Sequence, residues 1–240
     1  MNHIHTFVFS LLLSVSLITC SQATEDKAGP IRIMPLGDSI TQADSQHPGY
    51  RYALWQLLKQ GGYDIDFVGS MKRNFRGENP VQSFDTDHEG HWGWSADQVL
   101  NGFPGTGKLD DFLKQNTPDI VLLHLGSNDI FRGEPIQEIE ADLTKIINTI
   151  ISHNKDITIL IAQILPAAHS QANVRISELN KVISLIPQKI GIPDTQLLVV
   201  NQFEGFNPRT DTYDGLHPNT AGEEKMAGKW YCAIQSVISK

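Results

Sequence analysis

Cysteine is almost absent from this sequence of 240 residues, which contains only Cys20 and Cys232. If Cys20 is removed or modified on export, Cys232 has no partner, so the sequence excludes a disulfide framework and a zinc site built from cysteines. Cys232 lies in a helical run over 221–239, where we expect it to be a small buried hydrophobic side chain. The fold must therefore be held together by its apolar core.

Basic side chains are also scarce, because 19 Lys and Arg stand against 27 Asp and Glu, for a net charge of -8. This is the wrong sign for a protein that holds nucleic acid by its phosphates, so we expect no nucleic-acid partner. Internal repeats are missing, and Gly (19) and Pro (12) are near ordinary usage, which excludes repeat arrays, collagen-like chains and disordered chains. Since 40% of the residues are hydrophobic, we expect one core and a single domain over residues 30–240.

Charged side chains are missing from the first 23 residues, and the apolar run 7–19 is too short to span a bilayer comfortably. With small residues at positions 21 and 23, this pattern predicts a signal peptide over residues 1–23 that is cleaved near Ala23. An alternative interpretation takes Leu17 to Cys20 as a lipoprotein signal that leaves a lipid anchor on Cys20. Both interpretations predict an exported protein, whether periplasmic, secreted or held at the surface. No other segment approaches the length of a membrane span.

Alternating strand-like and helix-like patterns predict the fold class. Continuous apolar runs, typical of parallel strands buried on both faces, lead us to expect strands at 31–36, 64–68, 119–125, 158–164 and 197–200. Helical patterns predict helices at 50–60, at 95–101 with a Ser95/Gln98 capping box, at 135–152, after a cap at Asn173, and at 221–239. We therefore predict an α/β protein, a three-layer α/β/α sandwich with a central five-stranded parallel sheet.

Polar side chains follow three of the predicted strands: Ser39 the first, Asn128 the third, and Asp214 with His217 the fifth. The carboxyl ends of parallel strands meet at one edge of the sheet, where loops converge. A serine hydroxyl needs an imidazole to accept its proton, and the imidazole needs a carboxylate to hold its tautomer. We therefore predict Ser39 as nucleophile, His217 as base and Asp214 as its partner. The backbone N–H groups of Ser39 and Gly93 and the amide of Asn128 are the expected oxyanion donors.

Four sequence blocks carry a family resemblance: PLGDSIT (35–41), HEGHWGWSADQV (88–99), HLGSNDI (124–130) and DGLHPN (214–219). Their order and spacing resemble those of the SGNH, or GDSL, hydrolase superfamily. Together with GYRYALWQLL (49–58) and DFVGS (66–70), they are most similar to carbohydrate esterase family three, whose members remove acetyl groups from xylan. The resemblance implies a flavodoxin-like sandwich, ester hydrolysis and the same catalytic roles. The sequence departs from the family at Gln42-Ala43, where glycine is common, and at Trp92, where a smaller residue is usual, and both positions concern the acyl pocket.

These observations predict a serine esterase that removes short acyl groups, above all acetyl, from a polysaccharide such as xylan. The reaction needs no metal or cofactor, and the partner is an acylated carbohydrate or small ester substrate. We expect Asp38, Trp92, Trp94 and Tyr213 to contact the substrate, because aromatic faces suit the apolar faces of sugar rings, and Tyr50 is a further stacking candidate. A lysophospholipase- or thioesterase-type lipid hydrolase and a non-catalytic carbohydrate-binding relative stay open as alternatives, as does the oligomeric state.

The remaining histidines favour structural roles. His88 and His91 lie in an HEGH sequence that is one residue shorter than a zinc-protease motif and has no third ligand, so we expect His88 to form local hydrogen bonds. His124 lies in an apolar strand and is predicted to be a buried, hydrogen-bonded imidazole. The sequence contains no GxSxG, which argues against a standard α/β-hydrolase.

Overall fold

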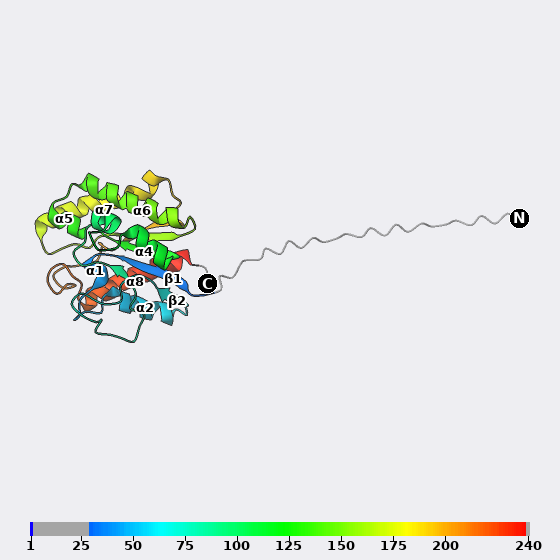
Figure 1. Ribbon diagram of the computed structural model, residues 1–240, viewed down its shortest axis with the longest axis horizontal. Helices are drawn as coiled ribbons and strands as arrows, with labels where there is room; N and C mark the ends of the chain where they lie inside the picture. The colour runs from blue at the N-terminus through cyan, green and yellow to red at the C-terminus, as the bar shows by residue number, and fades with distance from the viewer. Residues whose placement is uncertain (2–28, 239–240) are drawn as a thin grey trace.

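The structure is a computed structural model that describes Met1 and residues 29–238 (Figure 1). The predicted signal peptide, its cleavage site at Ala23 and the alternative lipid anchor at Cys20 lie outside the described residues and stay predictions. In the part of the chain that is described, no helix combines the length and the apolar character needed to cross a bilayer.

The centre of the fold is a parallel sheet. Its strands are β1 (Ile31–Gly37), β2 (Ile65–Phe67), β3 (Glu89–Gly90), β4 (Ile120–His124), β5 (Thr158–Gln163) and β6 (Leu197–Asn201). They lie in the order β2-β1-β4-β5-β6, while the two-residue β3 pairs with Leu36 and Gly37 at the end of β1. The five predicted strands are confirmed, and β3 is an addition that the sequence analysis did not predict.

Helices cover both faces of the sheet, which confirms the three-layer α/β/α prediction (Figure 1). One face carries α1 (Ser39–Gln42), α2 (Tyr50–Gln60) and α8 (Thr220–Val237). The other face carries α3 (Ala96–Asn101), α4 (Leu109–Asn116), α5 (Ser127–Arg132), α6 (Ile136–His153) and α7 (Ser170–Ile190). The predicted capping box of Ser95 and Gln98 is present at the start of α3.

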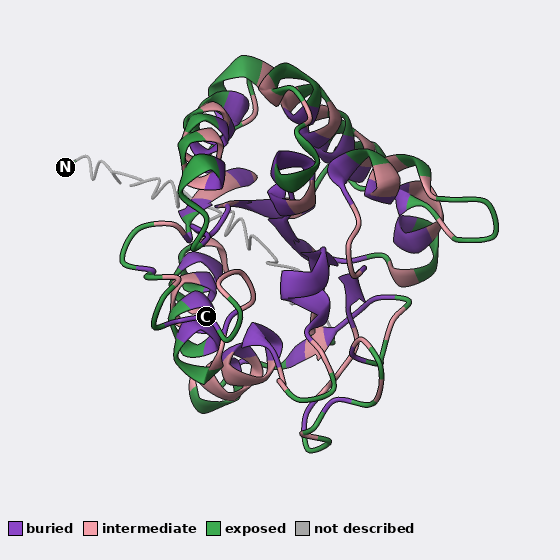
Figure 2. Ribbon diagram, turned by 90° about the vertical axis from the view of Figure 1, so that its left-hand side faces the viewer, coloured by how far each residue is buried: buried purple, intermediate pink, exposed green. Residues whose placement is uncertain are grey.

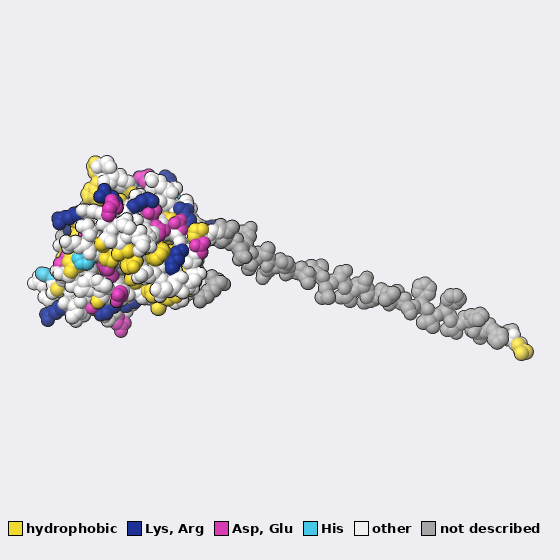
Figure 3. Space-filling view, turned by 90° about the horizontal axis from the view of Figure 1, so that it is seen from below, with side chains coloured by type: hydrophobic (Ala, Val, Ile, Leu, Met, Phe, Trp, Pro, Cys, Tyr) yellow, Lys and Arg dark blue, Asp and Glu magenta, His cyan; other side chains and the backbone are white. Residues whose placement is uncertain are grey.

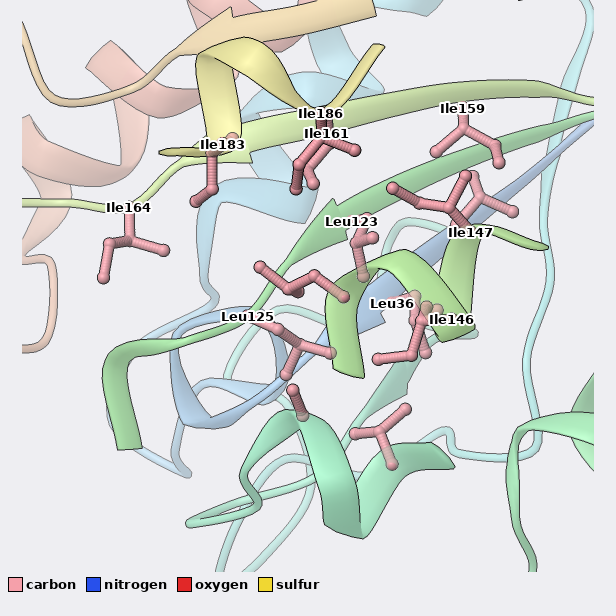
Figure 4. Close-up of a cluster of buried hydrophobic side chains, with 14 of the residues drawn as sticks. Leu36, Leu123, Leu125, Ile146, Ile147, Ile159, Ile161, Ile164, Ile183 and Ile186 are labelled. Carbon is pink, nitrogen blue, oxygen red and sulfur yellow. The ribbon is translucent and has the colours of Figure 1, made fainter. Parts of the chain in front are cut away.

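Two apolar clusters hold these layers together. Because successive side chains of a strand point to opposite faces, Leu36, Leu123 and Ile161 pack toward α6 and α7 (Figure 4). Their neighbours Leu122 and Leu160 pack toward α2 and α8 instead. Figure 2 shows the buried residues concentrated in the sheet and on the inner sides of the helices. On the face seen in Figure 3, acidic and basic side chains are interspersed.

Two detailed predictions about the helices are wrong. α7 begins at Ser170 with His169 as its N-cap, and the Asn173 side chain instead bonds both the backbone N–H of Ala167, at 2.8 Å, and its carbonyl, at 2.6 Å. Cys232 is exposed, not buried. The buried positions of α8 include Met226, Trp230, Ala233 and Ile234, which follow the helical period, and position 232 falls outside that stripe.

Candidate active site

The carboxyl ends of β1 and β4 lie side by side, with Gly37 paired to His124. The strand order reverses here, since β2 lies on one side of β1 and β4, β5 and β6 follow on the other. In open α/β sheets, ligands bind beside such a reversal point. Ser39 begins α1 directly after β1, and Asn128 lies on α5 directly after β4. Residues from two of the four sequence blocks therefore meet where a ligand site is expected.

Ser39, His217 and Asp214 form a continuous chain of hydrogen bonds. Ser39 Oγ lies 2.9 Å from His217 Nε2, and His217 Nδ1 lies 2.7 Å from Asp214 Oδ2. With a neutral imidazole, Nδ1 donates to the carboxylate and Nε2 accepts from the hydroxyl, which is the tautomer that a general base requires. The fold thus brings together three side chains from two loops that are far apart in the sequence.

The loop before α8 fixes the Asp214 carboxylate. Its Oδ1 accepts hydrogen bonds from the backbone N–H groups of Leu216, at 3.0 Å, and His217, at 2.8 Å. Gly215 allows this turn with a φ of 90°, in the left-handed region that favours glycine. Partial burial raises the pKa of Asp214, but the hydrogen bonds from the His217 side chain and from the two N–H groups outweigh it, so the pKa lies below its usual value. An ionised Asp214 can stabilise a cationic imidazole.

α5 braces two of the three predicted oxyanion donors, because it carries Asn128 and holds the loop of Gly93. Asn128 Nδ2 donates to the Trp94 carbonyl at 2.9 Å and lies 3.4 Å from Asp38 Oδ2. Arg132, at the end of the same helix, donates through Nη2 to the Gly93 carbonyl at 2.7 Å. Apart from its two chain neighbours, a Cβ at Gly93 would meet no described atom within 4 Å, and its φ of 80° lies in the left-handed region that favours glycine. The loop that carries Gly93 and the amide of Asn128 are therefore braced against each other.

Asp38 lies behind this arrangement, not at its surface. It is fully buried, and its Oδ1 accepts a hydrogen bond from Ile40 N at 3.0 Å as the N-cap of α1. Burial raises the pKa of Asp38 to about 7, although the bond from Ile40 lowers it and the nearby Asp129 carboxylate raises it further. The structure offers no surface of Asp38 for the substrate contact that the sequence led us to expect. Asp38 instead supports the position of Ser39 and lies beside Asn128.

The aromatic residues divide into two groups. Trp92 and Tyr213 both stack on the His217 imidazole, with ring centroids 4.7 Å and 5.7 Å away. Trp94 stacks on His91 at 4.1 Å, outside this contact. The expectation that Tyr50 stacks on a sugar is wrong, because Tyr50 is only 1% exposed and its hydroxyl lies 3.2 Å from Thr41 Oγ1 in the core.

Two hollows adjoin the hydrogen-bonded side chains of Ser39, His217 and Asp214. The smaller, of about 10 Å³, is bordered by Ser39, Ala43 and Glu223 and has room for about one water-sized group. Ala43, in the pair Gln42-Ala43 that departs from the family resemblance, adopts a φ of 59°. The larger hollow, of about 400 Å³, is bordered mainly by polar groups, including Arg76 and Asp214. A hollow of about 560 Å³ at Gln163, Asn180 and Phe203 is bordered by none of the predicted site residues.

Three titratable residues at the site were not predicted from the sequence. Asp44 contacts His47 Nδ1 with its Oδ1 at 2.8 Å and accepts a hydrogen bond from the Tyr213 hydroxyl with its Oδ2 at 3.0 Å. Glu223 accepts a hydrogen bond from Gly49 N at 3.0 Å. Burial raises the pKa of Glu223 to about 7, against smaller lowering effects of the Gly49 bond and of His47. Their closeness in sequence to the blocks PLGDSIT and DGLHPN was the signal that could have drawn attention to them.

The other histidines have structural surroundings. His88 Nδ1 accepts a hydrogen bond from Gly90 N at 3.0 Å, which confirms the expected local bonding. His124 is fully buried, as predicted, but neither of its ring nitrogens finds a hydrogen-bond partner among residues 29–238, so the predicted bonds are missing there. Burial lowers the pKa of His124 to about 4. Among residues 29–238, no three His, Cys, Asp or Glu side chains are grouped so as to hold a metal ion.

The chain matches an acylhydrolase family and is similar to known esterases. Residues 36–225 match the profile of the GDSL-like lipase/acylhydrolase family. A multidomain esterase of Ruminococcus flavefaciens is 28% identical over 250 residues, which is 95% of this chain and 32% of that protein. The chain thus spans about a third of the length of that relative.

Two solved structures extend the likeness to three dimensions. A family 3 carbohydrate esterase of Clostridium thermocellum is 31% identical, with a TM-score of 0.71 over 87% of this chain and 97% of that one. A variant of an acetyl esterase, crystallised with an acetate ion, is 25% identical, with a TM-score of 0.74 over 86% of this chain and 97% of that one.

Proposed function

Because the chain belongs to the GDSL-like lipase/acylhydrolase family, we propose that it is a serine esterase that cleaves short acyl esters through an acyl-enzyme. The observation that carries this proposal is the contact of 2.9 Å between Ser39 Oγ and His217 Nε2, which continues at 2.7 Å from His217 Nδ1 to Asp214. A serine hydroxyl that already touches a carboxylate-bound imidazole is arranged for proton transfer before any substrate binds.

The proposed acylation step begins with attack of Ser39 Oγ on the ester carbonyl carbon, while the hydroxyl proton moves to His217 Nε2. The carbonyl oxygen becomes an oxyanion, and the N–H groups of Ser39, Gly93 and Asn128 are the donors proposed to stabilise it. His217 then gives its proton to the departing alcohol oxygen as the ester C–O bond breaks, which leaves the acyl group on Ser39.

Deacylation repeats these steps with water in place of the serine. His217 Nε2 takes a proton from the attacking water and gives it to Ser39 Oγ as the second tetrahedral intermediate collapses to a carboxylic acid and free Ser39. Asp214, whose pKa is lowered by its hydrogen bonds, remains available as the anionic partner of the His217 cation in both halves of the cycle.

The hollow of about 10 Å³ beside Ser39 supports acetyl as the acyl group. A methyl group is about the size of one water molecule, so it fits this space, which offers little room for a longer chain. The likeness to an acetyl esterase crystallised with acetate supports the same assignment.

The neighbouring hollow of about 400 Å³ supports a carbohydrate as the alcohol part of the ester. Its border includes Asp44, Arg76 and Asp214, whose charged groups suit sugar hydroxyls better than the acyl chain of a lipid. Together with the likeness to a family 3 carbohydrate esterase, this favours an acetylated polysaccharide such as xylan.

A substrate panel tests the proposal. The enzyme should hydrolyse p-nitrophenyl acetate and release acetate from acetylated xylan, with much slower turnover of the butyrate and octanoate esters. Octanoate as the preferred substrate would replace the carbohydrate proposal by the lipid one. Binding of acetylated xylan without any turnover would identify a carbohydrate-binding relative.

Export is a separate proposal that follows from the sequence of residues 1–23. Intact mass of the protein from the cell envelope or medium should show cleavage near Ala23, or a lipid attached to Cys20. The full-length mass in the cytoplasm would contradict both forms of the proposal.

A further inference from the structure

Five aromatic rings form a continuous series of stacked contacts through His217. Phe75 and Trp92 lie 4.3 Å apart at 14°, and Trp92 and His217 lie 4.7 Å apart at 18°. His217 and Tyr213 lie 5.7 Å apart at 15°, and Tyr213 and His47 lie 4.0 Å apart at 6°. Each distance joins ring centroids and each angle joins ring planes. The proposed catalytic imidazole is thus stacked against two aromatic side chains.

We propose that Trp92 and Tyr213 are positioning residues, which hold the His217 ring in the plane of its two hydrogen bonds and stabilise the cation that it forms in each step. This inference rests on the proposed esterase function. It assigns Trp92 and Tyr213 to the imidazole, in place of the role in stacking on sugars that the sequence suggested.

The geometry explains why an imidazole needs such support. The χ2 torsion of histidine has a broad energy profile, so the side chain does not fix its own ring plane. The hydrogen bonds at Nδ1 and Nε2 restrain rotation of the ring about χ2, but each bond tolerates a range of angles, so the ring plane can still rock. Parallel aromatic faces remove that tilt, and a pre-oriented base keeps Nε2 on Ser39 Oγ.

The positive charge that the His217 imidazole acquires in each step gives a second reason for the aromatic contacts. A cation that lies over an aromatic face within about 6 Å of its centroid is attracted by the negative face of the ring. Both Trp92 and Tyr213 lie within that distance of His217. The attraction exists only while the imidazole is protonated, so it lowers the energy of the transition states relative to the free enzyme.

The segment that follows Ser39 anchors both rings. The Trp92 backbone N–H donates to Gln42 Oε1 at 2.8 Å, and the Tyr213 hydroxyl donates to Asp44 Oδ2 at 3.0 Å. Gln42 ends α1, the short helix that Ser39 begins, and Asp44 lies two residues further on. The same stretch of chain therefore carries the nucleophile and holds the two rings that orient its base.

Trp55 supplies a control tryptophan that borders neither hollow at the site, because it lies on α2 and packs on Phe84 with ring centroids 6.3 Å apart. On p-nitrophenyl acetate, which has no sugar, Trp92→Leu should lower kcat by roughly 2- to 30-fold with little change in KM. Trp55→Leu should leave kcat near the wild-type value, and Trp92→Phe should restore most of the loss because it keeps an aromatic face. Circular dichroism melts of all variants check that they fold.

Tyr213 provides an independent test if Trp92→Leu fails to fold. Tyr213→Phe keeps the ring and loses only the bond to Asp44, so it should retain most of kcat, while Tyr213→Leu should lose several-fold. Wild-type kcat on p-nitrophenyl acetate in Trp92→Leu or Tyr213→Leu, or a rise in KM for acetylated xylan alone, would overturn this inference and favour contact with sugar. A wild-type protein that hydrolyses no ester would instead overturn the proposed function, and this inference with it.

Discussion

The molecule contains two sets of serine, histidine and acidic side chains that differ in the order of their hydrogen bonds. In the first set, the His217 imidazole lies between Ser39 and Asp214. In the second set, the Glu89 carboxylate lies in the middle, because Oε1 accepts from Ser70 Oγ at 2.8 Å and contacts His91 Nε2 at 2.7 Å. Each imidazole also stacks on a tryptophan of the same loop, Trp92 for His217 and Trp94 for His91.

The group in the middle of each set determines whether the serine can be activated. An imidazole in contact with a hydroxyl can accept its proton near neutral pH, whereas a carboxylate is a weaker base by about two pKa units. The exposure of the serine does not determine which set is catalytic, since Ser70 is exposed while Ser39 is only 5% exposed. We therefore expect the second set to act as a structural clamp that joins the end of β2 to the loop of Gly93.

The largest difference in kcat is expected between the alanine variants of the two serines, Ser39 and Ser70. Ser39→Ala should lower kcat for acetyl ester hydrolysis by roughly 10⁴- to 10⁶-fold, because it removes the nucleophile. Ser70→Ala should keep a rate close to that of wild type. Steady-state hydrolysis of p-nitrophenyl acetate measures both rates, and equal losses in the two variants would show that the order of the hydrogen bonds does not distinguish the two serines.

The next largest effect on kcat is expected from replacing the carboxylates of the two sets, Asp214 and Glu89. Asp214→Asn should lower kcat by roughly 10²- to 10⁴-fold, since an amide can hold the His217 ring in the wrong tautomer and cannot balance its positive charge. Glu89→Gln should leave kcat nearly unchanged, because His91 takes no part in proton transfer. A larger loss of kcat in Glu89→Gln than in Asp214→Asn would show that the second set is the catalytic one.

The oxyanion donors are expected to contribute less than the nucleophile. Asn128→Ala should lower kcat by roughly 10²- to 10³-fold, the usual effect of removing one preorganised donor. Asn101→Ala serves as a control, because that exposed amide bonds to Asp97 at 2.7 Å on its own helix. If Asn128→Ala kept full kcat, the oxyanion would have to be stabilised elsewhere.

The smallest expected effect on rate accompanies a measurable effect on stability. Glu89 is fully buried and accepts hydrogen bonds from Ser70 N, at 2.7 Å, and from Ser70 Oγ. Glu89→Gln turns one of these acceptor positions into a donor and should lower the free energy of unfolding by roughly 1–3 kcal/mol. The Asp214 side chain is 42% exposed, so Asp214→Asn should cost less stability in the same urea titration. A larger loss of stability in Asp214→Asn than in Glu89→Gln would contradict the structural role of Glu89.

Most strands and helices of the fold were predictable from the sequence, because they depend on local patterns of apolar residues. Strands buried on both faces read as continuous apolar runs, and α6 buries Ile139, Leu143 and Ile146 at the helical spacing that predicted it. The close approach of Ser39, Asp214 and His217 followed from a second regularity, since loops after parallel strands share one edge of the sheet.

What the sequence did not predict depends on contacts between distant segments. The two-residue β3 exists because it pairs with the end of β1, and no local propensity identifies so short a strand. The stacking of Trp92 on His217 joins the second block to the fourth, which residue types alone cannot indicate. The exposure of Cys232 was different, because the helical period of α8 already placed that position outside the buried stripe.

The most direct test of the central claim, that His217 activates Ser39, is peptide mapping after reaction with a fluorophosphonate, which labels activated serines. We predict one covalent label, on the peptide that contains Ser39, and loss of that label in His217→Ala but not in His91→Ala. Label on Ser70, or undiminished labelling of Ser39 in His217→Ala, would contradict the account.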